Sequence, residues 1–481
     1  MNAPRRVIPI QAATTWSGIE AASKVQPRAA HGRFTRLRWA TLWATQLFFF
    51  CVPWLQWNGR QMVRFDLEAK RFYLGQLILL PQDLIFLAGL LVFCAMLLFV
   101  VTTVAGRVWC GFSCPQTVYT ELFMWVERRF EGERHHRLRL DQSGWSADKL
   151  WRRGGKHLAW LVISLWTGLT FVGWFSPIRD IGAQALHASL GFWDGFWIVF
   201  YGAACYGNAG FLREKVCLHM CPYGRFQGAL MDQDTLIVAY DSGRGEPRGA
   251  RRDAGDKAAG RAASRQAGAC IDCTMCVQVC PTGIDIRQGL QAACIGCALC
   301  IDACDAVMDK IGQPRGLVRY ATLRELDGRS EPSGTGESMW ARHRVRIYAG
   351  LMLTLVAALG WSLAQRADVR VDVIRDRGVM ARLVDDGAIE NVYRLQLMNQ
   401  TEAVQALSLG VDGLPGAQIT VQEGVRLSPV EDRQLTVSVR VPGERAARLA
   451  GQTVPIRFRV ASRSEQGSSL VVEPSTFVVP R

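Results

Sequence analysis

The chain has 481 residues, of which 49% are hydrophobic and 20% are charged. This composition excludes an intrinsically disordered protein and a collagen-like fibre, and the length allows several folded units. Fifty-six basic and 42 acidic residues give a formal net charge of +14. A basic excess of this size occurs in nucleic-acid-binding proteins and in membrane proteins, so its position along the chain decides between the two classes.

Five uncharged apolar blocks predict an α-helical transmembrane bundle. Each is close to the roughly 20 residues that carry a helix across a bilayer, and a helix satisfies its own backbone groups in lipid. A buried core helix is the alternative for any single block, but five blocks flanked by charge favour a membrane bundle. Residues 1–30 contain no apolar run, so the first span is expected to act as the membrane signal. The predicted spans are 40–57, 84–106, 158–175, 196–212 and 347–364.

Arginine and lysine gather in alternate connections between these spans, which predicts the orientation of the chain. They precede the first span and crowd the second and fourth connections, whereas the connection between the third and fourth spans carries only Arg179. The positive-inside rule therefore places segment 1–39 and loop 213–346 in the cytoplasm. Five spans then leave residues 367–481 outside, in the periplasm of a bacterial inner-membrane protein. This distribution argues against a nucleic-acid partner.

Cysteine usage agrees with this orientation. All 15 cysteines lie between Cys51 and Cys304, and the predicted outer tail has none. A secreted disulfide framework is therefore excluded, and a reducing compartment would keep the thiols free for metals. Three cysteines within the predicted spans, Cys51, Cys94 and Cys205, are interpreted as small buried hydrophobic residues.

The strongest motif is a pair of C-x2-C-x2-C-x3-C runs within about 262–312. This is the bacterial ferredoxin pattern, in which three thiolates hold one [4Fe-4S] cluster and the fourth ligates the partner cluster. A zinc ribbon would need two C-x2-C pairs rather than two quartets. Asp305 follows the last cysteine where many ferredoxins have proline. The predicted ligands are Cys270, Cys273, Cys276 and Cys304 for the first cluster, and Cys294, Cys297, Cys300 and Cys280 for the second.

A second constellation consists of two C-x3-C-P motifs, each just after an even-numbered span. The first contains Cys110 and Cys114, and the second contains Cys217 and Cys221. Since each proline suits the first turn of a following helix, the four thiols are expected at one depth. Thiolates are soft donors that favour copper(I), and His219, Met220 and Met124 lie nearby in sequence. Packing cysteines, or ligands of a further iron–sulfur centre, remain the alternatives.

The tail 367–481 shows period-two alternation of apolar and polar residues, as in Leu435, Val437, Val439 and Val441. Such runs, separated by Gly and Pro turns, predict a two-sheet β-sandwich. Without Cys, His or an acidic cluster, the tail is expected to be an interaction or stabilising domain. Two Gly-rich segments, Asp241–Gly268 and Glu325–Glu337, are interpreted as tethers that make the cluster module a flexible cytoplasmic unit.

Several segments together resemble the CcoG family, also called FixG or RdxA, of membrane polyferredoxins linked to cbb3-type cytochrome c oxidase assembly. They are Trp109-Cys-Gly-Phe-Ser-Cys-Pro-Gln-Thr-Val-Tyr-Thr-Glu, Cys221-Pro-Tyr-Gly-Arg-Phe-Gln, Asp234-Thr-Leu-Ile-Val-Ala-Tyr-Asp, Arg244-Gly-Glu-Pro-Arg and the first ferredoxin run. The resemblance implies an immunoglobulin-like outer domain and a cupric reductase that turns Cu(II) into Cu(I). It also implies that the four C-x3-C-P thiols handle copper as a substrate or transient ligand, and that copper exporters and oxidase assembly factors are partners.

Two other functions remain open at this point. A quinol-dehydrogenase-type module would exchange electrons with the quinone pool, and it would also combine membrane helices, C-x3-C-P pairs and ferredoxin repeats. A non-enzymatic scaffold for oxidase assembly would use its clusters only to sense iron or oxygen. The sequence names neither the electron donor nor the oligomeric state.

Overall fold

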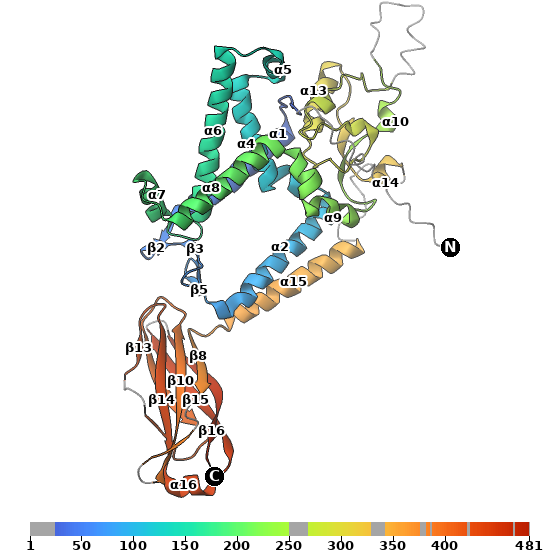
Figure 1. Ribbon diagram of the computed structural model, residues 1–481. Helices are drawn as coiled ribbons and strands as arrows, with labels where there is room; N and C mark the ends of the chain where they lie inside the picture. Colours follow the sequence, from blue (N-terminus) through green and yellow to red (C-terminus); the bar gives the residue numbers. More distant parts are fainter. Residues whose placement is uncertain are drawn as a thin grey trace, which may run out of the picture. The chain divides into compact units, whose positions relative to one another are not determined.

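The computed structural model describes residues 25–249, 268–328, 342–375, 381–384, 387–420, 424–464 and 467–480. The predicted cytoplasmic segment, both tethers and the first residues of the predicted cluster module lie partly outside these ranges. The chain forms two compact units, and Figure 1 shows the elements of each. The first comprises Met1–Trp54 and Gly89–Val356, and the second comprises Leu55–Ala88 and Ala357–Arg481.

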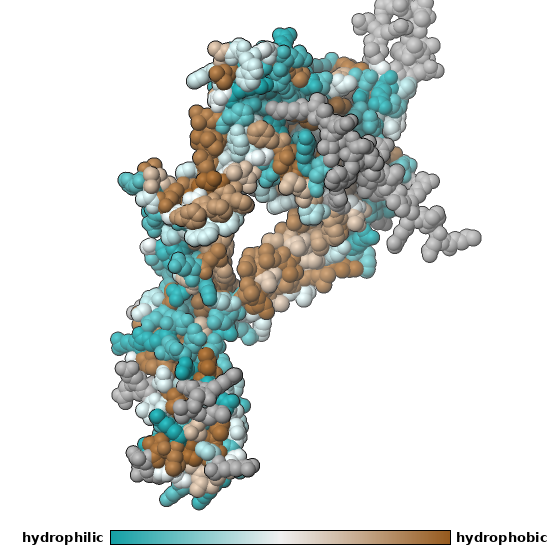
Figure 2. All heavy atoms as spheres, viewed as in Figure 1, coloured by the Kyte–Doolittle hydropathy of each residue, from teal (hydrophilic) through white to brown (hydrophobic). Residues whose placement is uncertain are grey.

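Helices form at all five apolar blocks. They are α1 (Arg33–Cys51), α2 (Leu84–Ala105), α6 (Ala147–Val172), α8 (Phe192–Gly207) and α15 (His343–Ala364). Two stretches, Pro81–Ala105 and His343–Ala364, are long and apolar enough to cross a membrane, and none of either apolar window is buried. Hydrophobic residues accordingly gather over α2, α15 and α8 in Figure 2. This exposed surface supports a membrane-associated chain, because full-length apolar helices rarely face water. Five spans remain a prediction.

The helix ends differ from the predicted spans for local reasons. The α1 helix ends at Cys51 because Pro53 follows, and a short 3-10 turn (Val52–Trp54) leads into strands rather than continuing to 57. The α6 helix begins 11 residues before the apolar block, where the Ser146 hydroxyl accepts a hydrogen bond from the backbone of Lys149 at 3.2 Å. At its end, α8 widens into a π-helical turn (Asn208–Leu212).

Small residues let α6 and α8 pack closely. A Cβ atom at Gly168 would lie 2.2 Å from the carbonyl oxygen of Ile198, and Gly202 faces the backbone of Ser164. Close approach through glycine is typical of helix pairs in membranes. Beside this contact, the fully buried Trp160 stacks on Phe123 with ring centroids 5.2 Å apart. The prediction that three cysteines are buried is wrong. Cys51 and Cys94 are exposed on their helices, and Cys205 is half-buried.

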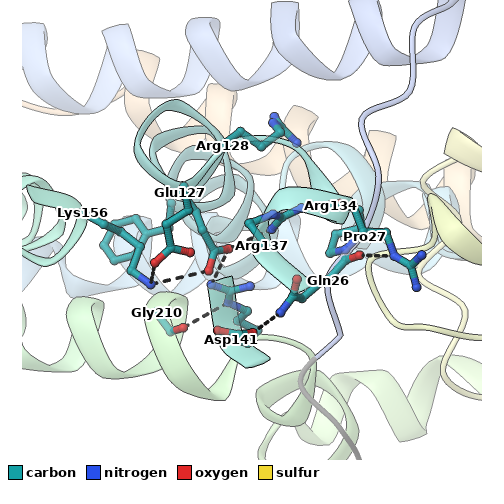
Figure 3. A network of polar contacts seen from close by, with 12 residues as sticks. Gln26, Pro27, Glu127, Arg128, Arg134, Arg137, Asp141, Lys156 and Gly210 are labelled. Atoms are coloured by element: carbon teal, nitrogen blue, oxygen red, sulfur yellow. Dashed lines mark hydrogen bonds and ion pairs between the residues drawn. The ribbon is translucent and has the colours of Figure 1, made fainter. Parts of the chain in front are cut away.

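A buried ion-pair network joins α4 (Pro115–Glu131), α5 (Arg134–Gln142), α6 and the turn after α8, and Figure 3 shows it. Its centre is Glu127, which is fully buried. One carboxylate oxygen of Glu127 lies 3.2 Å from Arg137 and 3.1 Å from Arg213, and the other lies 3.8 Å from Lys156. Lys156 also pairs with Glu131 at 2.7 Å. Charges so deeply buried are tolerated only when paired, so the network locks these elements in one arrangement.

The cluster module belongs to the first unit and is built from short elements. The strands β6 (Ile237–Tyr240) and β7 (Val318–Ala321), which precede and follow the cysteine runs in the chain, pair antiparallel. Its helices and turns are α10 (Ser242–Gly245), α12 (Met275–Gln278), η6 (Ile286–Gln288), α13 (Leu299–Lys310) and α14 (Leu323–Leu326). The remaining short helices of this unit are α3 (Val108–Phe112), α7 (Ile178–Leu186), η5 (Val216–Met220) and α9 (Pro222–Leu230).

The C-terminal β-sandwich is confirmed. One sheet has the order β12-β14-β10-β8 with β9 beside β10, and the other has the order β13-β11-β15-β16. The predicted inward positions are buried, and Tyr393 and Phe458 meet at its centre with ring centroids 5.0 Å apart. The strands are β8 (Val369–Arg375), β9 (Arg382–Leu383), β10 (Ile389–Asn399), β11 (Gln405–Asp412), β12 (Gln418–Thr420), β13 (Arg426–Leu427), β14 (Asp432–Val441), β15 (Thr453–Ser464) and β16 (Gly467–Val478), with α16 (Gly443–Arg448) between β14 and β15.

The second unit also contains a segment that the sequence did not predict to be folded. Residues between α1 and α2 form β1 (Gln56–Trp57), β2 (Arg60–Gln61), β3 (Val63–Asp66), β4 (Arg71–Leu74) and β5 (Leu77–Leu79), followed by η3 (Pro81–Asp83). Arg60 forms an ion pair with Glu402, and Arg366 pairs with Asp83 at 2.6 Å. These pairs attach the segment to the turn between β10 and β11 and to the residues just before β8.

Removal of residues 367–481 is expected to leave the iron–sulfur clusters in place. All predicted cluster ligands lie in the first unit, and the sandwich has its own hydrophobic core. The iron content and visible absorption of the truncated, membrane-inserted protein should therefore equal those of the full chain. A truncated protein that inserts into the membrane but loses its iron would show that the sandwich supports the clusters.

Candidate metal centres

The two ferredoxin runs share an unusual backbone conformation, which confirms that they are structural repeats. In the first run, Asp272 and Thr274 have positive φ values of 54° and 55°. In the second, Gly296 and Ala298 occupy the equivalent positions with φ values of 68° and 60°. Non-glycine residues rarely adopt this left-handed conformation, and such strain is typical of loops that wrap a ligand. Each run then enters a short helix, α12 or α13, one residue later.

The fourth cysteine of each run lies near thiols of the other run. Burial raises the pKa of Cys300 well above its usual value, and the thiols of Cys297, Cys294, Cys280 and Cys276 raise it next in order. Burial likewise raises the pKa of Cys304 to about 12, with contributions from Cys276 and Cys273. Cys280 thus lies with the second run and Cys304 with the first. This exchange of the fourth cysteine is the arrangement of a two-cluster ferredoxin.

The surroundings of these thiols fit iron–sulfur clusters. A small cavity between the two runs is lined mostly by cysteines and apolar side chains, among them Ile284, Ile286 and Ile295. Such a lining excludes water and suits sulfur ligands rather than exposed zinc or magnesium sites. Burial raises the pKa of five of these thiols, so metal binding to them would release protons; they are Cys276, Cys294, Cys297, Cys300 and Cys304. Assignment of the eight individual cysteines to the two clusters agrees with this geometry and stays a prediction.

The two C-x3-C-P motifs have the same local structure. Cys114 and Cys221 are extended, with ψ values of 129° and 110°, and each is followed by a proline in the first turn of a helix, α4 or α9. Burial raises the pKa of Cys217 to about 12, and Cys114, Cys110 and Cys221 raise it in that order. The four thiols therefore lie near one another, although they come from positions about a hundred residues apart. Within the described residues, no group of three or more His, Cys, Asp or Glu is arranged as a ready-made single-ion site.

A buried glutamine that the sequence analysis missed contacts this group of thiols. The side-chain amide of Gln227, on α9, lies 3.4 Å from the Cys110 sulfur and is completely buried. Cys110 has a raised pKa, for which burial is the largest cause, and the bond to Gln227 opposes that shift. Gln227 therefore connects the second motif's helix to the first motif's cysteine. Its only sequence signal is its place six residues after Cys221.

The second cluster's ligand loop packs directly on the first C-x3-C-P motif. A Cβ atom at Gly111 would lie 2.8 Å from the Cα and 2.9 Å from the backbone nitrogen of Cys297. The adjacent Cys110 packs against Ile295, Cys297 and Leu299 in one hydrophobic cluster. Glycine in a short helix, with no special φ, is needed here because nothing larger fits between the two backbones. The thiol group and the second cluster's ligands are therefore neighbours.

Arg107 joins the three parts of this region. Its guanidinium donates to the carbonyl oxygens of Cys294 at 3.1 Å and Ala292 in the cluster loop. It also donates to the carbonyl oxygen of Gly224 in α9 at 2.5 Å. A planar guanidinium with five donors can hold several carbonyl groups at once. Arg107 thus holds the cluster loop, the first motif and the second motif together.

The prediction of a loosely tethered module is wrong for its described residues. Asp302, which is 5% exposed on α13, accepts hydrogen bonds from the backbone nitrogens of Phe34 at 3.1 Å and Thr35 at 2.7 Å. These are orphan donors at the start of α1, so Asp302 satisfies a helix terminus. The Tyr320 ring of β7 also packs edge-on against Phe34 of α1, with ring centroids 5.5 Å apart. The module is therefore packed on the helices, a contact that composition alone does not reveal.

Known protein families match both the iron–sulfur region and the C-terminal sandwich of the chain. Residues 212–323 match the family model of a 4Fe-4S dicluster domain, and residues 87–132 match a 4Fe-4S binding domain. Residues 359–480 match the immunoglobulin-like fold at the C-terminus of FixG. The nitrogen fixation protein FixG of Rhizobium meliloti is 36% identical over 94% of this chain and 90% of its own.

The chain belongs to the FixG/RdxA family. Protein RdxA of Cereibacter sphaeroides is 40% identical over 82% of this chain and 84% of its own, and RdxB of the same organism is 38% identical over 82% and 86%. A crystal structure of a FixG-related protein from Vibrio parahaemolyticus covers 24% of this chain and 97% of its own, with 23% identity and a TM-score of 0.21. Iron–sulfur electron transfer is thus the activity class of this FixG/RdxA member.

Proposed function

We propose that this protein is a cupric reductase in a bacterial inner membrane, which supplies Cu(I) for the assembly of a cbb3-type cytochrome c oxidase. Copper exporters and oxidase assembly factors would accept the Cu(I). The arginine-rich connections support a cytoplasmic position for the clusters and a periplasmic one for the sandwich. Membership of the FixG/RdxA family supports the electron-transfer part of this proposal.

The observation that carries the proposal is the contact between Gly111 and the Cys297 backbone. It puts a cluster ligand loop beside four cysteines that are soft donors for copper(I). Electron transfer from a one-electron centre to a metal ion needs the two to be close, and Cu(II) needs a single electron to become Cu(I). A structural role for the C-x3-C-P thiols would not need a redox centre against them.

The clusters, the four thiols and the residues around them would each have a separate role in the reduction. The clusters, when bound, supply electrons one at a time. Cys110, Cys114, Cys217 and Cys221 would hold the copper ion, and thiolate ligands would favour its reduced form. The Gln227 amide would orient the Cys110 sulfur, and Arg107 would keep the cluster loop in contact with both motifs. Burial raises the pKa of Cys110 and Cys217, so copper binding to these two thiols would release protons.

Simultaneous change of Cys110, Cys114, Cys217 and Cys221 to serine should abolish Cu(I) formation while leaving the two ferredoxin-type clusters in place. The purified protein is reduced without oxygen, freed of excess reductant and given Cu(II). Cluster reoxidation is followed beside Cu(I) captured by a chelator. The wild type should form one Cu(I) for each electron that leaves the clusters.

The matched control changes Cys51 and Cys94, which lie outside all predicted ligand sets, to serine and should behave like the wild type. Wild-type clusters that stay reduced in the presence of Cu(II) would exclude cupric reduction and leave quinone exchange or a scaffold role.

A second candidate role for the same thiols is a further iron–sulfur centre. The 4Fe-4S binding domain model covers Cys110 and Cys114, which is the specific observation in its favour. The quadruple serine variant separates the two roles. A thiol site for copper leaves the iron content unchanged, whereas a third cluster lowers it by one third.

A further inference from the structure

A wide hollow borders the ligand loops of the second cluster. Its volume is about 900 Å³, at the upper end of the range for small-molecule sites. Its walls come from the segment before α1, from α1 and from α4. Part of its lining is Val279 and Pro281, which flank the cluster ligand Cys280, and Leu299, which precedes Cys300. A molecule in the hollow would therefore lie beside the ligands of the second cluster.

The charge of this hollow is strongly positive. Four arginines and His31 line it, against the two acids Glu121 and Glu133. Glu121 is already paired with Arg38 at 3.4 Å and with Arg128 at 3.3 Å. The lining arginines are Arg28, Arg36, Arg128 and Arg129.

Two of these arginines remain available for an anion. The side chains of Arg36 and Arg129 are exposed and have no ion-pair partner in the part of the chain that the structure describes. They come from two different helices, α1 and α4. Guanidinium groups bind phosphate through paired hydrogen bonds, so a phosphate-bearing ligand fits this rim.

Flat apolar surfaces complete the site. Trp125 is 48% exposed and Trp39 is half-buried, and both line the hollow together with Met124. Indole rings offer large faces for stacking on a planar ring system. The lining thus combines aromatic faces, a cationic rim and a wall formed by chain neighbours of the cluster ligands.

We propose that this hollow is the electron-entry site and that it takes a reduced, phosphate-bearing flavin such as flavin mononucleotide. A [4Fe-4S] cluster accepts one electron, whereas a nicotinamide delivers a hydride, and flavins serve both kinds of chemistry. The reduced flavin would lose two electrons and two protons, one electron would go to each cluster, and the protons would pass to solvent. The proposal deepens the electron-transfer role and holds whether or not copper is the acceptor.

Titration of the full-length, cluster-containing protein in detergent with oxidised flavin mononucleotide tests the site. Flavin fluorescence should be quenched on binding, and riboflavin, which lacks the phosphate, should bind more weakly. The combined Arg36→Gln and Arg129→Gln variant should bind flavin mononucleotide at least about tenfold more weakly, since it loses two guanidinium groups that would form charge-assisted hydrogen bonds with the phosphate. Its affinity for riboflavin should change little.

Arg33→Gln with Arg139→Gln is the matched control. These two exposed arginines do not line the hollow, so flavin binding should equal that of the wild type. A second measurement adds reduced flavin mononucleotide without oxygen or copper and follows cluster bleaching, which should be slower in the Arg36 and Arg129 variant. Absence of flavin binding by the wild type would overturn the proposal. So would an equal loss of flavin affinity in the Arg36 and Arg129 variant and in the control variant. Neither result depends on copper, so failure here and failure of cupric reduction are distinguishable.

Discussion

Replacement of Gly111 by valine is expected to slow electron transfer from the clusters to copper, while the protein keeps both its clusters and its four C-x3-C-P thiols. The new side chain would meet the backbone of Cys297, which cannot move aside as a flexible side chain can. The cluster loop must therefore shift away from the Cys110–Cys114 motif. Because a displacement of about 1 Å can lower a reaction rate by about 10²-fold, we expect a loss of that order in Cu(II)-dependent cluster reoxidation. Stopped-flow absorption of the reduced protein measures this rate.

Gly154 provides the matched control for this substitution. It lies in α6, and a Cβ atom there would have no neighbour within 4 Å. Gly154→Val should reoxidise at the wild-type rate. The iron content of both variants must equal that of the wild type, which separates a displaced loop from an unfolded module. A Gly111→Val protein with full iron and an unchanged rate would show that electrons reach copper by another route.

Replacement of Glu127 by glutamine is expected to cause the largest loss of stability. Glu127 is fully buried and faces Arg137, Arg213 and Lys156, as Figure 3 shows for the first and last of these. Glutamine keeps the size of the side chain but leaves buried cations without their counter-charge. Breaking a buried pair in this way costs about 3–5 kcal/mol. The loss of stability is measured by thermal unfolding of the detergent-solubilised protein, with limited proteolysis reporting the unfolded fraction.

A surface pair in the same helical region is the comparison. Asp148 and Arg152 form an i,i+4 ion pair at 2.8 Å with both side chains exposed. Asp148→Asn should cost at most about 1 kcal/mol, because exposed pairs are screened by water and salt. Equal effects of the two substitutions would mean that water reaches Glu127 and that the network does not hold α4, α5 and α6 together.

Much of the site could be predicted because its signals are local. The eight ferredoxin cysteines and the four C-x3-C-P cysteines are recognisable from their spacing, and spacing reflects how a short loop wraps a cluster or begins a helix. The sandwich was equally predictable, since alternation along β10, β14 and β15 reports which side of each strand is buried. The five apolar blocks predicted helices correctly but not their ends.

Helix ends were harder because caps and breakers override hydropathy. Ser146 starts α6 well before its apolar face, and Pro53 stops α1 inside a block that reads as one span. Similarly, the glycine-rich linkers indicated a loose module, yet Asp302 and Tyr320 contact the start of α1 and attach the module to the helices. A linker's composition describes the linker and says nothing of what its two ends contact.

The sequence by itself determined the ferredoxin motifs, the C-terminal sandwich and the family, because these depend on local spacing, periodicity and motif identity. Only the tertiary structure decided that the Cys297 loop lies on Gly111, that Arg107 and Gln227 join the two motifs, and that an arginine-rimmed hollow borders Cys280. The hydrogen bonds of Arg107 and Gln227 join residues 117 to 187 positions apart. Such contacts depend on how whole surfaces fit together, which no local pattern in the chain encodes.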